Sequence, residues 1–312
     1  MRAVAATQYG GPDTYTITDV PDPSTGPDRI VVKVTAASIN PVDYKILAGA
    51  LDGAFPVVWP LVPGWDVAGE VVAVGPAVSA LRPELVPGAK VLGYARMDFV
   101  GAGTWAQQVA MPMRGLALAP QNLDAAHASC LPLAGLTAYQ LLTEAVDVQP
   151  GERDLIHAAS GGVGHLAVQI ARSLGATVIG SASAKNQDFV RSLGADAVEY
   201  GDGLPEQVRS LAPDGVDAVL DLVGGLAIEQ TPGLLKSSGR WATITDAARA
   251  SELGGTYVFV RPDPAQLAEL ARLADSGAVV PRVHATYGLG AVSDAVNESM
   301  RSIPGKVVLT VD

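Results

Sequence analysis

Strands and helices alternate regularly in the middle of this 312-residue chain, and that alternation constrains its fold more than any other feature. Between residues 153 and 258, short β-rich segments such as "RDLIHAA" and "VDAVLDLVG" alternate with helical segments such as "GHLAVQIARSLG". A strand that is followed by a helix and then by a second strand is typical of a parallel sheet with helices on both faces. The sequence therefore predicts a doubly wound α/β domain in this region.

A glycine-rich turn joins the first strand of this region, residues 154–159, to its first helix. Compared with the pattern G-x-G-x-x-G, Ala159 replaces the first glycine, whereas Gly161 and Gly164 hold the second and third places. The second glycine lets the backbone approach a pyrophosphate, the third lets the helix pack closely, and the helix N-terminus attracts phosphates. Because the pattern lies between a strand and a helix, it favours dinucleotide binding over a turn that only packs. The residues expected around the pyrophosphate are Ser160, Gly161, Gly162, Val163 and Gly164.

The end of the second strand indicates which dinucleotide the turn binds. An NAD-specific site has a carboxylate there, about 20 residues after the glycines, which holds the ribose hydroxyls. This chain has "IGSASAK" at residues 179–185, and no acidic residue occurs before Asp188. Ser181 and Ser183 are hydrogen-bond donors, and Lys185 supplies positive charge for a 2′-phosphate, which a carboxylate would repel. We therefore expect NADPH, against the alternative that Lys185 is an ordinary solvated residue at a helix start.

Charge and cysteine content limit the remaining function classes. The 21 basic and 32 acidic residues give a formal net charge of −11, which argues against a general nucleic-acid or anionic-membrane surface. The single cysteine, Cys130, excludes an intrachain disulfide and is typical of a reducing cytoplasm. Neither the initial "MRAVAATQYGG" nor any later segment has the apolar length of a signal sequence or a membrane span. The sequence thus predicts a cytoplasmic protein that binds neither nucleic acid nor membranes.

The first third of the chain has a different pattern from the middle. Short β-rich segments, among them "RIVVKVTAAS" and "DVAGEVVAVG", are separated by Gly/Pro turns without long helical patterns between them. This spacing indicates a compact, partly barrel-like β domain. Helical character begins near Leu123, where two helical segments are separated by Pro132. The last stretch contains a strand-like "GTYVFV", a helix over "DPAQLAELARLADSG" and a final strand in "GKVVLTVD".

The chain resembles the medium-chain dehydrogenase/reductase superfamily, and most of all its zinc-independent quinone oxidoreductase branch of zeta-crystallin-like enzymes and enone reductases. The resemblance covers nearly the whole chain and is carried by "ASINPVDYK", "PLVPGWDVAGEVVAVG", "LPLAGLTAYQLL", "HAASGGVGHLAVQIARSLGA", "DAVLDLVGG" and "GKVVL". It implies a GroES-like catalytic domain over residues 1–120, a Rossmann NADPH-binding domain over 121–258 and a return to the catalytic domain over 259–312. It also implies a homodimer in which "GTYVFV" pairs across a two-fold axis.

The same resemblance allows the metal site of zinc-dependent relatives to be checked position by position. Those relatives bind zinc through a cysteine, the histidine of a Gly-His-Glu motif and a second cysteine. The matching positions here are Asn40, Trp65 and Ala134, and none of these is a usual zinc ligand. The four-cysteine structural lobe is also absent, and no pair of the four histidines has ligand-like spacing. We therefore expect no catalytic or structural metal.

The catalytic residues are expected in the motif "NPVDYK". The resemblance places Asn40 near the nicotinamide and tyrosines along the substrate cleft. Tyr44 is the candidate for orienting a carbonyl or relaying a proton, although the family's tyrosine often stands where this chain has Lys45. Asp43 is expected to fix the loop rather than to exchange protons. Three aromatic residues nearby either form an apolar substrate wall or pack in the core: Phe55, Trp59 and Trp65.

Further cofactor contacts are expected on two grounds. Ligands bind at the carboxyl ends of parallel strands, which nominates Leu222 and Ile244 as walls for the adenine or the nicotinamide. The family resemblance adds Tyr200 at the adenosine end, and Thr137 and Lys306 from the catalytic side.

Three functions are compatible with these residues. The first is an NADPH-dependent oxidoreductase that transfers hydride to quinones or α,β-unsaturated carbonyls. The second is an enoyl or carbonyl reductase with a larger substrate, and the third is a protein that binds NADPH without catalysis. An electron-poor acceptor needs no metal to polarise it, because the cofactor carries the chemistry. We therefore favour the first function.

Overall fold

The computed structural model describes residues 1–312, which divide into two compact units. Unit 1 comprises Met1–Leu133, Pro262–Ser276 and Pro281–Asp312, and unit 2 comprises Ala134–Arg261 and Gly277–Val280. The division thus falls after Leu133 rather than after residue 120, because helix α3 (Ala125–Ser129) packs on the strands of unit 1. No helix combines the length and the apolar character that crossing a membrane requires.

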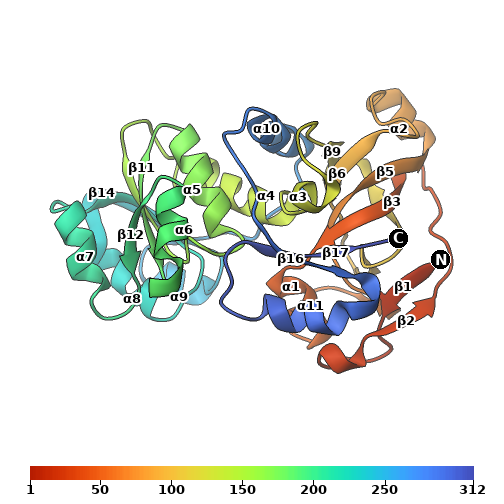
Figure 1. The fold of residues 1–312 in the computed structure, drawn as a ribbon, viewed down its shortest axis with the longest axis horizontal. Helices are drawn as coiled ribbons and strands as arrows, with labels where there is room; N and C mark the ends of the chain where they lie inside the picture. Colours follow the sequence, from red (N-terminus) through yellow and green to blue (C-terminus); the bar gives the residue numbers. More distant parts are fainter. The chain divides into compact units, whose positions relative to one another are not determined.

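Unit 2 is built on one six-stranded parallel sheet (Figure 1). The strand order is β12-β11-β10-β13-β14-β15, so the chain moves outward from β10 to β12 and then restarts at β13 on the other side. This reversal creates a switch point at the carboxyl ends of β10 and β13, which is where such sheets bind ligands. The strands are β10 (Arg153–Ile156), β11 (Thr177–Ala182), β12 (Asp196–Glu199), β13 (Val216–Asp221), β14 (Leu235–Thr243) and β15 (Thr256–Tyr257).

The helices of unit 2 connect these strands and cover the sheet. Right-handed crossovers place α5 and α6 on one face and α7, α8 and α9 on the other. Their bounds are α5 (Gly164–Ser173), α6 (Gln187–Ser192), α7 (Leu204–Leu211), α8 (Leu226–Gln230) and α9 (Ala247–Glu252). The segment before β10 is helical too: α4 (Pro132–Gln140) begins at Pro132, as expected, and continues into a π-helical turn over Leu141–Ala145.

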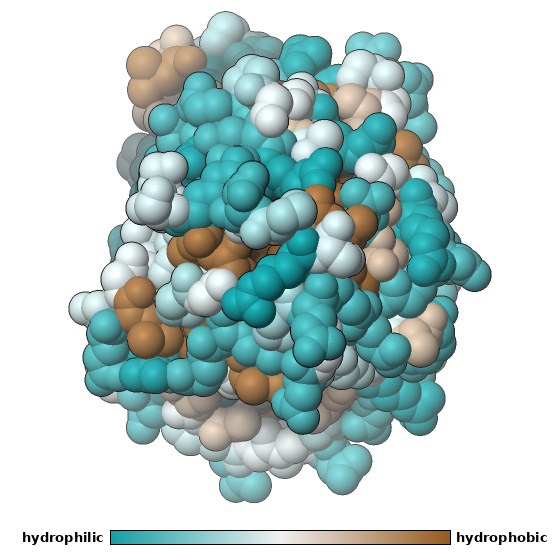
Figure 2. Space-filling model, turned by 90° about the vertical axis from the view of Figure 1, so that its left-hand side faces the viewer, coloured by the Kyte–Doolittle hydropathy of each residue, from teal (hydrophilic) through white to brown (hydrophobic).

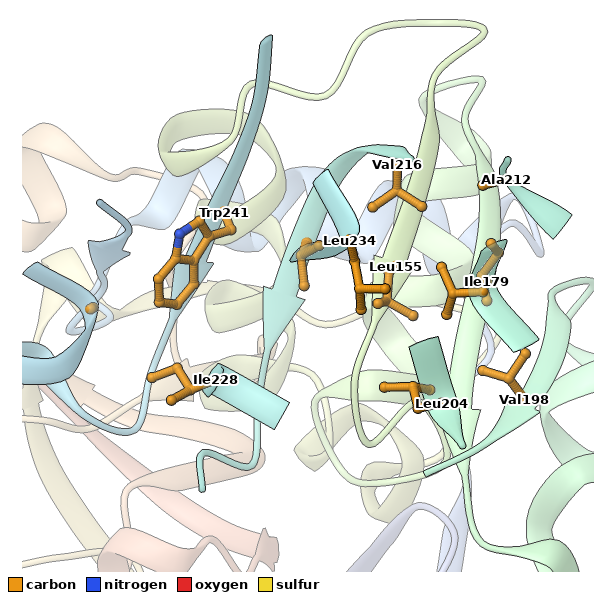
Figure 3. Close-up of a cluster of buried hydrophobic side chains, with 12 residues drawn as sticks. Leu155, Ile179, Val198, Leu204, Ala212, Val216, Ile228, Leu234 and Trp241 are labelled. Atoms are coloured by element: carbon orange, nitrogen blue, oxygen red, sulfur yellow. The ribbon is translucent and has the colours of Figure 1, made fainter. Parts of the chain in front are cut away.

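A cluster of buried apolar side chains lies between the strands and helices α7, α8 and α9 (Figure 3). The strands contribute residues such as Leu155, Ile179 and Val219, and α7 contributes Leu204 and Val208. Because the cluster holds β10 to β14 in fixed register, it also aligns the strand ends at which the cofactor residues are predicted.

Unit 1 is the β-rich unit that the first third of the sequence predicts. Its largest sheet runs β16-β17-β3-β5-β6-β9, with β8 also paired to β3, and two further pairs are β1-β2 and β4-β7. The strands are β1 (Arg2–Ala5), β2 (Thr16–Asp19), β3 (Arg29–Ser38), β4 (Val57–Val62), β5 (Asp66–Val74), β6 (Lys90–Tyr94), β7 (Val100–Ala102), β8 (Gln108–Pro112), β9 (Leu116–Leu118), β16 (Val283–Gly288) and β17 (Lys306–Thr310). Besides α3, its helices are α1 (Pro41–Leu47), α2 (Pro76–Leu81), α10 (Pro264–Asp275) and α11 (Val292–Ser299). The C-terminal strand β17 pairs antiparallel with β3, so the last strand of the chain joins a sheet formed mainly by the first third of the sequence.

The edge of the parallel sheet is shorter than the sequence suggests. Of the strand-like "GTYVFV", only Thr256 and Tyr257 pair, as β15, and Tyr257 and Phe259 are exposed.

On the side of the molecule that carries α7 and α8, hydrophobic residues form small patches separated by hydrophilic ones (Figure 2).

Candidate functional site

The glycine turn lies between β10 and α5, where the sequence places it. Ala158 adopts a φ of 50°, which bends the chain sharply after the strand. A Cβ on Gly164 would lie 2.2 Å from the carbonyl oxygen of Ala158, so only glycine lets α5 start this close to the turn. A Cβ on Gly161 would lie 3.3 Å from the same oxygen and has no other neighbour within 4 Å. The backbone at Gly161 therefore faces space that a ligand can approach.

Around the end of β11, the structure separates the two predicted serines. The Ser183 hydroxyl is buried and has no hydrogen-bond partner within the chain, so it is available to a bound ligand. Ser181 is only 1% exposed, and its hydroxyl lies 3.2 Å from Nδ1 of His157. Ser181 still belongs to β11, which is covered on both faces, and its side chain is therefore occupied internally. Lys185 stands exposed in the 3₁₀ turn that follows.

Two residues of this region were not expected as site residues. Asn186 is buried and donates from Nδ2 to the Ser160 hydroxyl at 3.2 Å, which ties the glycine turn to the turn after β11. His157 follows β10 directly, and burial lowers its pKa to about 4, against the opposing effect of the Asp221 carboxylate. The imidazole is therefore neutral at physiological pH, and its Nε2 has no partner within the chain. The only sequence signal for either residue is its position beside the glycine turn.

Asp221 organises the carboxyl ends of β13 and β14. One carboxylate oxygen accepts the backbone N–H groups of Val223 and Gly224, and the other accepts the hydroxyls of Thr243 and Thr245. These four hydrogen bonds hold the two loops that carry the half-buried Leu222 and Ile244. Leu222 and Ile244, the predicted wall residues, thus stand on fixed loops at the switch point. Tyr200, the predicted contact for the adenosine, follows β12 and is 60% exposed.

In unit 1, three neighbouring strands meet at a polar cluster formed by Ser38, Asn40, Asp66 and Lys306. β3 ends at Ser38, β5 begins at Asp66 and β17 begins at Lys306, and the sheet order β17-β3-β5 places these strand ends together. Asp66 accepts hydrogen bonds from the Ser38 hydroxyl at 2.6 Å and from Asn40 Nδ2 at 2.7 Å. Lys306 Nζ donates to Asn40 Oδ1 at 2.5 Å. Asn40 and Lys306, both predicted site residues, are therefore joined by a direct hydrogen bond although they are far apart in the sequence.

The first turn of α1 follows this cluster. Asp43 accepts the backbone N–H of Asn40 at 2.7 Å, which closes the helix start and agrees with the expected role of Asp43 in fixing the loop. Burial raises the pKa of Asp43 to about 8, although the hydrogen bond from Asn40 lowers it. Tyr44 is half-buried, and burial followed by the charge of Asp43 raises its pKa. Thr137 is buried in α4.

Unit 1 also contains a small pocket that is partly open to solvent and has both polar and apolar groups in its wall; it is lined by residues such as Ile46 of α1, Leu61 and Trp65. Phe55 packs edge-on against Trp65 with ring centroids 6.4 Å apart. Trp59 contacts Tyr9 instead, with centroids 5.2 Å apart. Of the three aromatic residues considered for a substrate wall, Trp65 lines the pocket and Phe55 supports it.

Comparison with known proteins places this architecture in a family. The family of alcohol dehydrogenase GroES-like domains matches residues 26–121, and the family described as zinc-binding dehydrogenase matches residues 162–260. A chloroplastic quinone-oxidoreductase homolog from Spinacia oleracea is 35% identical over 80% of this chain and 76% of its own length. The chain belongs to the medium-chain dehydrogenase/reductase superfamily.

Within the superfamily, the relatives belong to the quinone oxidoreductase branch. An NADPH-dependent alkenal/one oxidoreductase from Arabidopsis thaliana is 34% identical over 99% of this chain and 79% of its own length. The quinone oxidoreductase from Coxiella burnetii has the same fold over 100% of this chain and 99% of its own, with a TM-score of 0.86 and 30% identity. The expected GroES-like and Rossmann domains are thereby confirmed, and this oxidoreductase is an enzyme of the NAD(P)-binding type.

The cofactor and the metal fit this oxidoreductase differently. The steric restriction at Gly164, the open backbone at Gly161 and the unpartnered Ser183 hydroxyl suit a dinucleotide. The residues do not suit zinc: Asn40, Trp65 and Ala134 replace the expected ligands, and no group of three or more His, Cys, Asp or Glu side chains is arranged to hold a metal ion.

Proposed function

We propose that this oxidoreductase uses NADPH to reduce quinones or α,β-unsaturated carbonyls. The observation that carries the proposal is the glycine turn, which leaves a backbone approach at Gly161 and is followed by a strand end without a carboxylate. Bound NADPH supplies a hydride to the acceptor. The names of the relatives, a quinone oxidoreductase and an alkenal/one oxidoreductase, support the acceptor class.

The preference for NADPH over NADH rests on two side chains after β11. The buried Ser183 hydroxyl is a donor without a partner, and the exposed Lys185 adds positive charge beside it. Both suit a 2′-phosphate, and no acidic side chain opposes them before Asp188. Tyr200, Leu222 and Ile244 remain proposed walls of the nucleotide site. For Ser181 we propose an indirect role, because its hydroxyl is engaged by His157.

The residues of unit 1 bind and orient the acceptor. We propose that its apolar body lies at the open side of the small pocket beside Ile46 and Trp65. Asn40, held at both ends of its carboxamide, and Tyr44 at the start of α1 present polar groups to the acceptor carbonyl. Hydride addition leaves a negative charge on the acceptor, and one proton must follow, to the α-carbon of an enone or to the oxygen of a quinone; Tyr44 and solvent are the candidate donors.

We also propose that catalysis does not require zinc, since the side chains at the three ligand positions are unsuitable donors. Elemental analysis of protein purified without a metal-binding tag should show far less than one zinc per chain. A stoichiometric metal whose removal abolishes activity would contradict this part of the proposal.

Two further features complete the proposal. The edge strand β15, which includes the exposed Tyr257 and is followed by the exposed Phe259, suits a homodimer formed through a second copy of this edge. The single cysteine, Cys130, is buried and unpaired, which suits a reducing cytoplasm.

The direct experiment follows NADPH absorbance with a panel of quinones and enones of different sizes, and with simple alcohols plus NADP⁺ as the reverse control. We expect turnover with small electron-poor acceptors and negligible alcohol oxidation. Turnover confined to large enoyl substrates would favour the second function considered above. NADPH binding without turnover across the panel would contradict the reductase proposal and favour a non-catalytic binding role.

A further inference from the structure

Lys306 is an ammonium group placed inside unit 1 rather than at its surface. Gly305, with a φ of 81°, turns the chain into β17, and a Cβ there would lie 2.3 Å from the carbonyl oxygen of Arg282. The turn sets Lys306 as the first residue of β17, next to the end of β3. The residue is 4% exposed, although lysine is almost never buried without a partner. The burial therefore calls for a specific set of acceptors.

Oxygen atoms of the polar cluster supply those acceptors. Nζ of Lys306 lies 2.5 Å from Asn40 Oδ1 and 3.6 Å from Asp66 Oδ2. Asp66 is fully buried, and its carboxylate also accepts the Ser38 hydroxyl and the backbone N–H of Leu133. A carboxamide oxygen, a carboxylate and a hydroxyl are the ligands that small hard cations prefer. The cluster is therefore an oxygen-lined site of negative charge that is filled by a cation from the chain itself.

The ammonium also fixes the orientation of Asn40. Because Lys306 has only donors, it requires the carboxamide oxygen, and the amide nitrogen must then face the Asp66 acceptor. Removing the charge would leave Asp66 buried without a counter-ion and would release one end of Asn40.

We propose that Lys306 is the built-in cation of this cluster: its ammonium occupies a site that would otherwise accept a small exogenous cation, and it positions Asn40. The inference concerns cation binding by unit 1 and does not depend on the acceptor or on turnover. A side chain of the protein thus supplies positive charge beside Asn40, one of the three positions that match zinc ligands in the zinc-dependent relatives.

The test compares Lys306→Ala with Lys306→Met in thermal unfolding of the full chain. The alanine variant leaves space beside Asn40 and Asp66, whereas methionine fills that space without charge. Both variants should unfold at lower temperature than the unchanged protein. Ammonium or methylammonium chloride should raise the Tm of the alanine variant by about 2 °C or more beyond tetramethylammonium chloride at equal ionic strength, because the larger ion does not fit. The methionine variant and the unchanged protein should show no such difference.

A second variant keeps the proposal testable if the alanine variant does not fold. Lys306→Met combined with Asp66→Asn removes both charges, and it should unfold at a higher temperature than Lys306→Met alone. The proposal is overturned if the double variant is no more stable than Lys306→Met, or if a folded Lys306→Ala protein responds equally to all three salts. Since the readout is unfolding, absence of reductase activity would not affect the result.

Discussion

The two candidate sites of this oxidoreductase are built in opposite ways. In unit 2, consecutive residues of the glycine turn present backbone groups. Position 164 must be glycine because a side chain there would clash with the backbone. In unit 1, Ser38, Asn40, Asp66 and Lys306 come from segments far apart in the sequence and interact through side chains. At Gly164 the backbone-built site tolerates no added atom, whereas the site built from side chains depends on charge and on the matching of hydrogen-bond donors and acceptors.

The hydrogen bonding of buried carboxylates also differs between the two units. Asp66 of unit 1 is fully buried and has hydrogen-bond donors on both oxygens as well as a nearby ammonium. Asp154, in the central strand β10 of unit 2, is equally buried, but neither of its oxygens has a hydrogen-bond partner. The unpartnered carboxylate of Asp154 therefore favours its protonated form.

The largest effect is expected from a methyl group at Gly164. Gly164→Ala places a Cβ 2.2 Å from a backbone oxygen and should lower the free energy of unfolding by about 3 kcal/mol, the upper end for overpacking. A Cβ on Gly161 has a single close contact, 3.3 Å to the same oxygen, so Gly161→Ala should cost much less stability than Gly164→Ala and should weaken NADPH binding roughly tenfold or more by blocking the approach of the pyrophosphate. Denaturant unfolding and fluorescence titration measure the two effects.

Gly233→Ala is the matched control, because a Cβ there meets nothing within 4 Å. It should change neither stability nor binding. Equal stability of Gly164→Ala and Gly233→Ala would show that position 164 accepts a side chain, which contradicts the proposed steric requirement for glycine.

The second effect concerns the pH dependence of stability. Burial, followed by the charge of Glu152, raises the pKa of Asp154 from 3.8 to about 7. The folded chain therefore keeps a proton that the unfolded chain has released, so stability falls between about pH 4 and pH 7, by about 1 kcal/mol per pH unit. Asp154→Asn should remove this slope and stabilise the protein at pH 8.

Denaturant unfolding at several pH values measures this slope, with Asp196→Asn as the control, since Asp196 is exposed in the same sheet. The control should keep the slope of the unchanged protein. A slope that survives Asp154→Asn would mean that other groups cause it.

A smaller effect is expected from the one charged side chain proposed at the backbone-built site. Lys185→Ala should weaken NADPH binding by roughly tenfold to a hundredfold, as for loss of a charge-assisted contact worth about 1.5–3 kcal/mol. NADH binding should stay nearly unchanged, because NADH has no 2′-phosphate. Arg191→Ala, which removes an exposed charge paired with Asp188, controls for net charge. Equal affinity of the unmutated protein for NADPH and NADH would contradict the assignment.

The smallest effect is expected at Tyr44. If Tyr44 were the general acid, Tyr44→Phe would lower turnover by roughly 10²–10⁴-fold. We expect a loss below about tenfold, because Lys45 stands where the family often has its tyrosine and solvent can supply the proton. Steady-state turnover in water and the solvent isotope effect distinguish the two cases, and a hundredfold loss would make Tyr44 the donor.

The sequence was informative where structure is local. The strand, the glycine turn and α5 follow each other directly, so their patterns predicted the parallel sheet and the restriction at Gly164. The pairing of Asn40 with Lys306 was not predictable, because it depends on β17 joining β3. The internal role of Ser181 was missed for a related reason: its partner His157 comes from the neighbouring strand end, and no spacing in the sequence indicates that contact.

The most direct test of the proposed function traces the transferred hydrogen. NADPH carrying deuterium at C4 of the nicotinamide, in either stereochemical position, is incubated with the protein and a small enone in ordinary water. Mass spectrometry and NMR then locate the label in the reduced product. We predict deuterium on the β-carbon from one of the two labelled forms, and hydrogen from water on the α-carbon. A reduced product that carries no deuterium from either form would contradict direct hydride transfer.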